Sequence, residues 1–166
     1  MRSIATHSDP QTLADAWSRD ADWLDAQYNN RALVPDYASH LERWARVSAR
    51  VRETQRCELS LAYGDAATQT LDVFPAARPS GAVMVFIHGG YWRALSKSDA
   101  SFIAPAFTGS GVTVVVPNYS LCPAVSVEAI ALEMTQAVRW AWQHAADYGG
   151  DRQRITVAGH SAGGQL

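Results

Sequence analysis

Cysteine is scarce in this sequence: the 166-residue chain has only Cys57 and Cys122, which lie far apart. That separation fits no metal-ligand spacing, and we interpret both as reduced, buried thiols. No apolar run approaches the length that a membrane-spanning helix needs, and residues 1–10 lack the apolar core of a signal peptide. These absences predict a cytoplasmic protein that has no membrane partner.

Charge is also low and nearly balanced. Charged residues make up 18% of the chain, and the formal net charge is −2. Proteins that bind nucleic acid usually carry a basic excess, which is missing here. The sequence also has no metal-ligand cluster, no phosphate-binding loop and no dinucleotide fingerprint. We therefore expect no nucleic-acid partner, no metal and no cofactor, and a small molecule as the substrate. The oligomeric state stays open.

The first 55 residues have no strand-type pattern and carry helix signals. Asp9 and Pro10 fit the N-cap and first position of one helix, and residues 34–36 open a second. The apolar positions expected for the first helix are Leu13, Trp17, Trp23 and Leu24. The apolar face expected for the second is formed by Tyr37, Leu41, Trp44, either Val47 or Ser48, and Val51. We predict a helical segment over residues 1–55, followed by one α/β domain over residues 56–166.

The hydrophobic period changes to two after residue 56, which indicates strands. Residues 57–63 and 70–74 predict a β-hairpin. Continuous apolar runs predict strands at 82–87 and 112–117, and a short β-branched run predicts a last strand at 154–158. Helices are expected at 98–107 and 127–148, the second ended by a glycine pair. Strands that alternate with helices predict an α/β fold with a mostly parallel sheet and helices on both faces.

The strongest chemical motif is Gly-His-Ser-Ala-Gly at residues 159–163. This spacing is typical of a nucleophile elbow, in which a sharp strand-to-helix turn presents a serine hydroxyl, here Ser161. We expect Gly159 and Gly163 to be required by close backbone contacts. The N–H group of Ala162, directly after the serine, can donate to the oxyanion that forms during acyl transfer.

A second motif, His-Gly-Gly-Tyr-Trp at residues 88–92, follows the expected strand at 82–87. Parallel sheets place their sites at the carboxyl ends of their strands. If the two strands are neighbours, this glycine-rich loop and Ser161 lie on one rim of the sheet. A loop of small residues leaves backbone N–H groups bare, and these can supply further oxyanion donors.

Together these motifs resemble those of the α/β-hydrolases. The similarity is greatest to the branch related to hormone-sensitive lipase and, within it, to the kynurenine formamidases (arylformamidases). It is carried by residues 88–93, 117–121, 148–151 and 159–164, with 28–31 and 34–36 near the N-terminus. The resemblance implies that Ser161 is the nucleophile and that the backbone N–H groups of Gly90, Tyr91 and Ala162 form the oxyanion hole. Trp92 either lines the substrate pocket or packs in the core.

The sequence departs from this family in one large respect. The triad order of the fold is serine, then acid, then histidine, but no ionisable side chain follows Ser161. We therefore expect the acid and the base beyond Leu166, so that this chain is an N-terminal portion truncated after the elbow. Among the histidines, His88 is expected to brace the glycine loop, and His160 to point away from the substrate. Tyr119 is expected to support a strand end.

Three functions remain open. The favoured one is an arylformamidase that converts N-formylkynurenine to kynurenine and formate through an acyl-enzyme. The second is a general carboxylesterase of the same fold. The third is a non-catalytic remnant, because the chain as given contains no base for Ser161.

Overall fold

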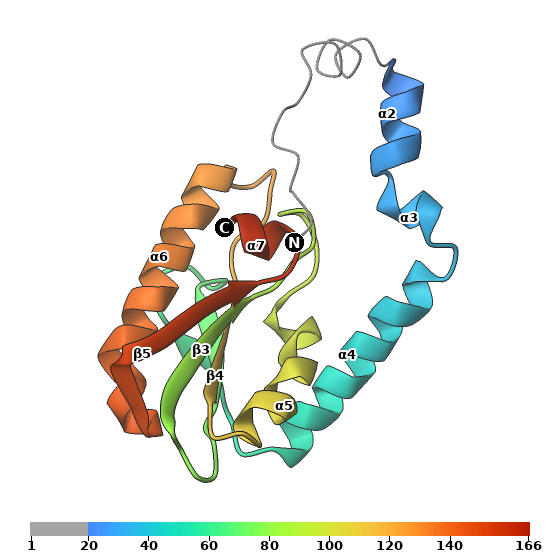
Figure 1. Ribbon diagram of the computed structural model, residues 1–166. Coiled ribbons are helices and arrows are strands. Elements are labelled where there is room, and N and C mark those ends of the chain that lie inside the picture. The colour runs from blue at the N-terminus through green and yellow to red at the C-terminus, as the bar shows by residue number, and fades with distance from the viewer. Residues whose placement is uncertain (1–19) are drawn as a thin grey trace, which may run out of the picture. The chain divides into compact units, whose positions relative to one another are not determined.

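The computed structural model describes residues 20–166 (Figure 1). The helix start expected at Asp9 and Pro10, together with Leu13 and Trp17, lies outside the described residues. Contacts divide the chain into two compact units, Met1–His40 and Leu41–Leu166. In the first unit, helix α2 (Ala21–Tyr28) begins at Asp20, whose side chain caps it by accepting a hydrogen bond from the backbone of Trp23. Helix α3 (Asn30–Leu33) follows after the expected break.

The second unit contains a five-stranded sheet with the order β1-β2-β4-β3-β5. The strands are β1 (Glu58–Ala62), β2 (Thr70–Phe74), β3 (Gly81–Ile87), β4 (Thr113–Pro117) and β5 (Gly150–Gly159). Strands β4, β3 and β5 are parallel, whereas β1 and β2 form the expected antiparallel hairpin at one side. The predicted α/β architecture with its parallel central strands is confirmed.

Helices cover both faces of this sheet. Helix α6 (Val127–His144) lies on one face, and α5 (Ala104–Thr108) lies with the later turns of α4 (Tyr37–Thr54) on the other (Figure 1). Because β3 and β4 are covered on both sides, their side chains are largely buried, as their continuous apolar runs predict. On α4 it is Ser48 that is buried and Val47 that is exposed.

The helix expected at 98–107 is wrong in its extent. The structure has two 3₁₀ turns, η1 (Lys97–Asp99) and η2 (Ser101–Ile103), and only then the short helix α5. Pro105 explains the difference, because its ring lacks an N–H group and would clash inside a longer α-helix. A proline is tolerated in the first turn, which is where α5 places it.

Helix α6 agrees more closely with its pattern. Ser126 caps its start, and its buried positions follow helical spacing. These buried side chains include Ile130, Met134, Ala137 and Ala141. The last turn of the predicted helix is the 3₁₀ turn η3 (Ala145–Tyr148), which ends at Gly149 with a φ of 73°.

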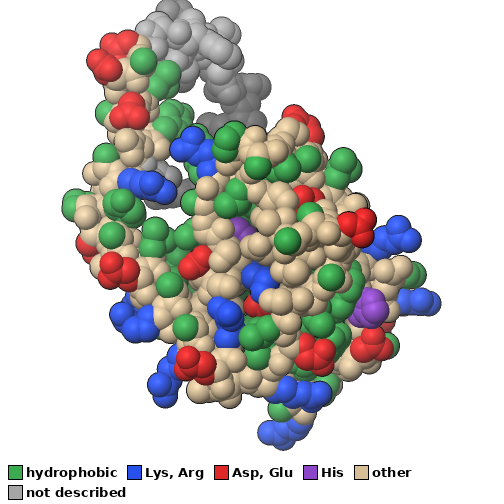
Figure 2. Space-filling model, turned by 180° about the vertical axis from the view of Figure 1, so that it is seen from behind, with side chains coloured by type: hydrophobic (Ala, Val, Ile, Leu, Met, Phe, Trp, Pro, Cys, Tyr) green, Lys and Arg blue, Asp and Glu red, His purple; other side chains and the backbone are tan. Residues whose placement is uncertain are grey.

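The surface carries both signs of charge. Acidic and basic side chains lie near one another over the face shown in Figure 2. Within residues 20–166, no helix has the length and apolar character that crossing a membrane requires.

Candidate active site

Ser161 lies at the turn between β5 and the short helix α7 (Ala162–Gln165), and its side chain is exposed. Its φ of 55° and ψ of −121° are rare for a residue with a Cβ atom, and such backbone strain is of order 1–3 kcal/mol. Two hydrogen bonds hold the turn: Gly163 N–H donates to the carbonyl of His160 and Gly164 N–H to that of Ser161, both at 2.9 Å. This is the geometry of a nucleophile elbow.

The two motif glycines are required by close backbone contacts. A Cβ atom on Gly159 would lie 2.2 Å from the carbonyl oxygen of Gly163. A Cβ atom on Gly163 would lie 2.1 Å from that of Ile87, at the end of β3. Neither contact can be relieved by moving a flexible side chain, so the expected steric role of both glycines is confirmed.

The glycine loop, residues 88–96, lies directly against this elbow. Strands β3 and β5 are neighbours, with Ile87 opposite Gly159. A Cβ atom added to Gly89 would lie only 3.1 Å from the Cβ atom of Ser161. The two motifs therefore share one rim of the sheet, as expected from strands that end side by side.

The expected oxyanion donors have no partner in the described part of the chain. The backbone N–H groups of Gly90, Tyr91 and Ala162 donate no hydrogen bond to a protein acceptor there. Gly90 has a φ of 118°, which only glycine adopts readily, and Tyr91 has a φ of 57°. Unpaired amides close to a serine hydroxyl can stabilise the charge that develops on a carbonyl oxygen under attack.

His88 and Tyr119 brace the start of the glycine loop. The Nδ1–H group of His88 donates to the carbonyl of Gly89 at 2.7 Å, which agrees with the expected role. The ring of Tyr119 stacks on His88 with centroids 4.2 Å apart, and its hydroxyl donates to the carbonyl of His88 at 2.9 Å. Burial lowers the pKa of His88 and raises the pKa of Tyr119 to about 12. Both groups are therefore neutral at pH 7.

Trp92 is half-buried and makes packing contacts. It packs against the cluster that contains Ile87 and Ile130, and its indole N–H donates to the side chain of Gln165 at 3.2 Å. The pocket role of Trp92 stays a prediction, because these contacts concern only its packing.

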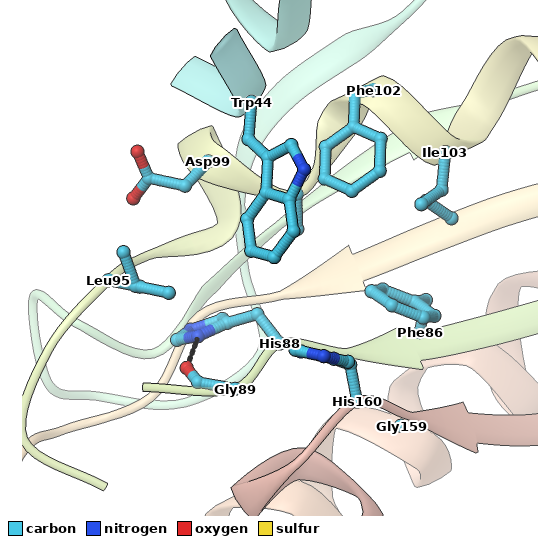
Figure 3. A pocket seen from close by; sticks show the side chains of 11 residues that line it. Trp44, Phe86, His88, Gly89, Leu95, Asp99, Phe102, Ile103, Gly159 and His160 are labelled. Atoms are coloured by element: carbon cyan, nitrogen blue, oxygen red, sulfur yellow. Dashed lines mark hydrogen bonds between the residues drawn. The ribbon is translucent and has the colours of Figure 1, made fainter. Parts of the chain in front are cut away.

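A cavity of about 360 Å³ lies on the α4 and α5 side of the elbow (Figure 3). Its wall is mainly apolar and includes Trp44, Phe86, Leu95, Phe102 and Ile103. The ring of Trp44 stacks on Phe102 at 5.4 Å and meets the edge of His160 at 5.8 Å. His160 thus lies against the indole in this wall. Neither Ser161 nor Trp92 lines the cavity.

Sequence reasoning missed two features near the site. The helical pattern of α4 marked Trp44 as buried but gave no indication of its partners. The buried ion pair between Lys97 and Asp72 was also missed. A carboxylate between Leu71 and Val73, in the middle of an apolar strand, was the available signal.

Both motifs lie in a segment that matches a known protein family. The sequence profile of a family described as the alpha/beta hydrolase fold matches residues 84–166, half of the chain. This matched segment runs from β3 to the end of the chain and includes both the glycine loop and the elbow.

Individual relatives are hydrolases. Kynurenine formamidase from Danio rerio is 28% identical over 162 residues, which cover 93% of this chain and 54% of that protein. Carboxylesterase NlhH from Mycobacterium tuberculosis is 37% identical over 93 residues, which cover 55% of this chain and 29% of that one. The crystal structure of a candidate thioesterase from Silicibacter sp. tm1040 is 35% identical, with a TM-score of 0.75, over 84% of this chain and 52% of that one.

The chain spans about half the length of the formamidase and thioesterase relatives. Over that span the profile match, the strand order and the strained serine turn all indicate the same fold. The chain belongs to the α/β-hydrolase fold family.

Proposed function

We propose that this chain supplies the nucleophile and the oxyanion-binding elements of a serine hydrolase that cleaves an amide or ester. The observation that carries the proposal is the close approach of the exposed, strained Ser161 to a loop whose Gly90 and Tyr91 amides have no hydrogen-bond partner among residues 20–166. In the reaction, Ser161 Oγ attacks the substrate carbonyl carbon, and the carbonyl oxygen becomes an oxyanion that the bare amides stabilise. The leaving amine or alcohol departs with a proton, and water then releases the acid from the acyl-enzyme.

The serine hydroxyl needs a base, and residues 162–166 contain no ionisable side chain. His88 cannot serve, because its Nδ1–H group donates to Gly89 and its Nε2 atom is buried without a partner among the described residues. We propose that the acid and the histidine base follow Leu166 in the whole protein, in the order that this fold uses. The greater length of the relatives supports this placement.

The favoured substrate is N-formylkynurenine, which would give formate and kynurenine. Its support is the match to kynurenine formamidase along 93% of the chain. A carboxylesterase acting on small acyl esters is the second candidate, favoured by the higher identity to NlhH over a shorter segment. The ratio of kcat/KM for N-formylkynurenine to kcat/KM for 4-nitrophenyl acetate distinguishes the two.

The test is a Ser161→Ala substitution in the whole protein. We expect kcat on the better substrate to fall by several orders of magnitude, about 10³-fold or more, with the circular dichroism spectrum unchanged. Ser110→Ala is the control, because Ser110 is an exposed serine far along the chain from both motifs.

Two outcomes would contradict the proposal. One is a Ser161→Ala protein that retains its activity. The other is turnover at triad-like rates by residues 1–166 produced alone, since an unassisted serine hydroxyl is a weak nucleophile. If the whole protein hydrolyses neither substrate, the non-catalytic alternative is favoured instead.

A further inference from the structure

We propose that the buried ion pair between Lys97 and Asp72 positions the far end of the glycine loop, so that its amides stay aimed at Ser161. This inference rests on the function proposed above. It makes Lys97 a positioning residue, since its charged group contacts no part of the candidate site directly.

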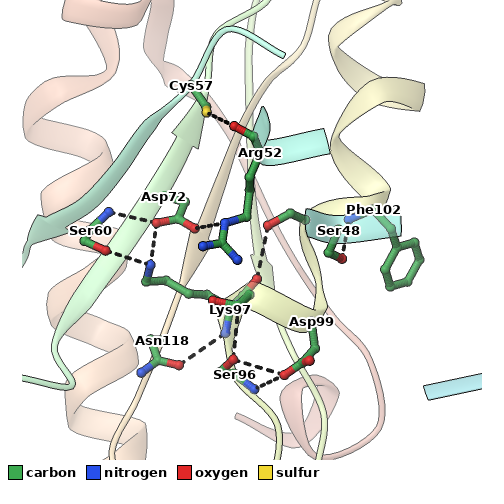
Figure 4. Close-up of polar contacts among 12 residues, drawn as sticks. Ser48, Arg52, Cys57, Ser60, Asp72, Ser96, Lys97, Asp99, Phe102 and Asn118 are labelled. Carbon is green, nitrogen blue, oxygen red and sulfur yellow. Dashed lines mark hydrogen bonds and ion pairs between the residues drawn. The ribbon is translucent and has the colours of Figure 1, made fainter. Parts of the chain in front are cut away.

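The ion pair is part of a buried polar cluster (Figure 4). Asp72 lies on β2 and is fully buried, and Lys97, the first residue of η1, is only 7% exposed. Lys97 Nζ donates to Asp72 Oδ1 at 2.5 Å and to Ser60 Oγ at 3.1 Å. The same Oδ1 atom accepts the backbone N–H of Ser60 at 2.8 Å, while Arg52 Nε lies 4.0 Å from Oδ2.

Stability alone is a weak explanation for this arrangement. Lysine and aspartate are rarely buried, because removing both charges from water costs about as much as their attraction returns. Phe74, two residues later on the same face of β2, is fully buried and apolar, so an apolar pair would suit this face of the sheet. An ion pair differs from an apolar pair because it fixes the position of one atom: the Nζ atom of Lys97 in η1 is held at the carboxylate of Asp72 on β2.

Lys97 is placed to pass that constraint to the glycine loop. It directly follows residues 88–96, and its own backbone N–H donates to Asn118 Oδ1 at 3.2 Å. Tyr119, which follows Asn118 in the chain, donates from its hydroxyl to the carbonyl of His88 at the start of the loop. Two consecutive residues after β4 therefore fasten both ends of the loop, and the Lys97 side chain ties the far end to β2 as well.

The loop needs such fastening because its backbone is strained. Tyr91, Trp92 and Leu95 have φ angles of 57°, 57° and 66°. Conformations of this kind persist only where the surroundings impose them. Within the loop, Arg93 and Ala94 both donate to the carbonyl of Gly90 at 3.0 Å. If the far end were released, the loop could relax, and a displacement of about 1 Å at the donors can cost about 100-fold in rate.

The test compares Lys97→Met with Arg52→Met in the whole protein. Both variants remove one cation beside Asp72, but Arg52 belongs to α4 and Lys97 to the turn after the loop. We expect the Arg93 and Ala94 amides to exchange with deuterium at least about tenfold faster in Lys97→Met only, when both are compared at equal global stability. We also expect kcat to fall about 10- to 100-fold with KM little changed, and Lys97→Arg to recover most of it.

A variant that leaves a buried charge unpaired can fail to fold, so the pair is also removed together. Lys97→Met with Asp72→Asn removes both charges of the ion pair, keeps an acceptor for the Ser60 N–H group and still breaks the link from Lys97 to β2, so faster loop exchange is expected again. Equal exchange in the Lys97 and Arg52 variants, or normal kcat in the double variant, would overturn the proposal. If the wild-type protein hydrolyses nothing, the proposed function fails while the exchange comparison still decides whether Lys97 fastens the loop.

Discussion

Gly90 leaves less room for a Cβ atom than Gly89, the other glycine of the loop. A Cβ atom there would lie 1.9 Å from the carbonyl oxygen of Ala94, and its φ of 118° is unfavourable for any side chain. The Gly90 N–H group is also one of the oxyanion donors proposed above. A single added methyl group therefore tests both the strain and the donor geometry.

We expect Gly90→Ala to lower kcat about 100-fold or more and to destabilise the fold by about 1–3 kcal/mol. Gly164→Ala is the matched control, because a Cβ atom there would lie 3.5 Å from its nearest neighbour, an ordinary contact. Urea denaturation and steady-state kinetics measure the two effects. Similar losses in both variants would show that the Gly90 conformation has no special role.

His88 makes stability depend on pH. Burial lowers the pKa of its imidazole below the ordinary value of 6.5, so the unfolded chain takes up this proton at a higher pH than the folded chain. The unfolded state then binds more protons below about pH 6.5, and the free energy of unfolding falls as the pH decreases through that value. Above it, both states are neutral at this position and the effect vanishes.

We therefore expect urea titrations between about pH 8 and pH 5.5 to show a steeper loss of stability in the wild type than in His88→Gln. The comparison concerns the slope, so a constant destabilisation by the substitution does not obscure it. Parallel slopes in the two proteins would contradict the assignment of a buried, neutral imidazole.

At the scale of secondary-structure elements, the sequence pattern predicted those strands, helices and turns whose formation depends mainly on neighbouring residues. The strands β3 and β4 follow from continuous apolar runs, the helix α6 follows from apolar positions at helical spacing, and the elbow follows from a five-residue motif. The helix expected at 98–107 was wrong because Pro105 would lie in its interior, where a proline breaks an α-helix.

Contacts between distant segments could not be predicted in this way. Lys97 and Asp72 are paired by the fold, and neither residue carries a local signal of the other. The same holds for Trp44 against Phe102 and His160, which build the cavity wall from three separate elements. Such pairings depend on how strands and helices are brought together, which the local pattern of a single sequence does not reveal.

Strand β5 forms one edge of the sheet in the described part of the chain. It pairs with β3 on one side, and no other described strand pairs with its outer side. Val157, in its middle, is 50% exposed, and most of its other residues are exposed too. An exposed strand edge with apolar side chains is a template for pairing with another molecule.

We expect residues 1–166, produced as a separate protein, to self-associate through this edge. Size-exclusion chromatography should show species larger than a monomer, and Val157→Lys should reduce them because a lysine on an edge strand disfavours pairing. Leu132→Lys, which changes an exposed leucine on α6 instead, serves as the control. A monomeric peak with a sharp thermal transition would mean that these residues form a self-sufficient domain.

On the scale of the whole molecule, three neighbouring parallel strands supply every described part of the candidate site. The glycine loop follows β3, the elbow follows β5, and the residues that brace the loop, Asn118 and Tyr119, follow β4. The helices cover the two faces of the sheet, and the residues of the candidate site all lie at one end of it.

The register of β3 with β5 also sets the order in which the site can form. Val83 pairs with Ile155, about 70 residues later in the chain, after β4 and α6 have been made. During synthesis the glycine loop therefore leaves the ribosome well before Ser161. Closing so long a segment costs entropy and slows folding, so we expect the elbow to join the glycine loop late in folding. A nascent chain that has reached only α6 lacks Ser161, so the two halves of the candidate site can meet only after β5 has been made.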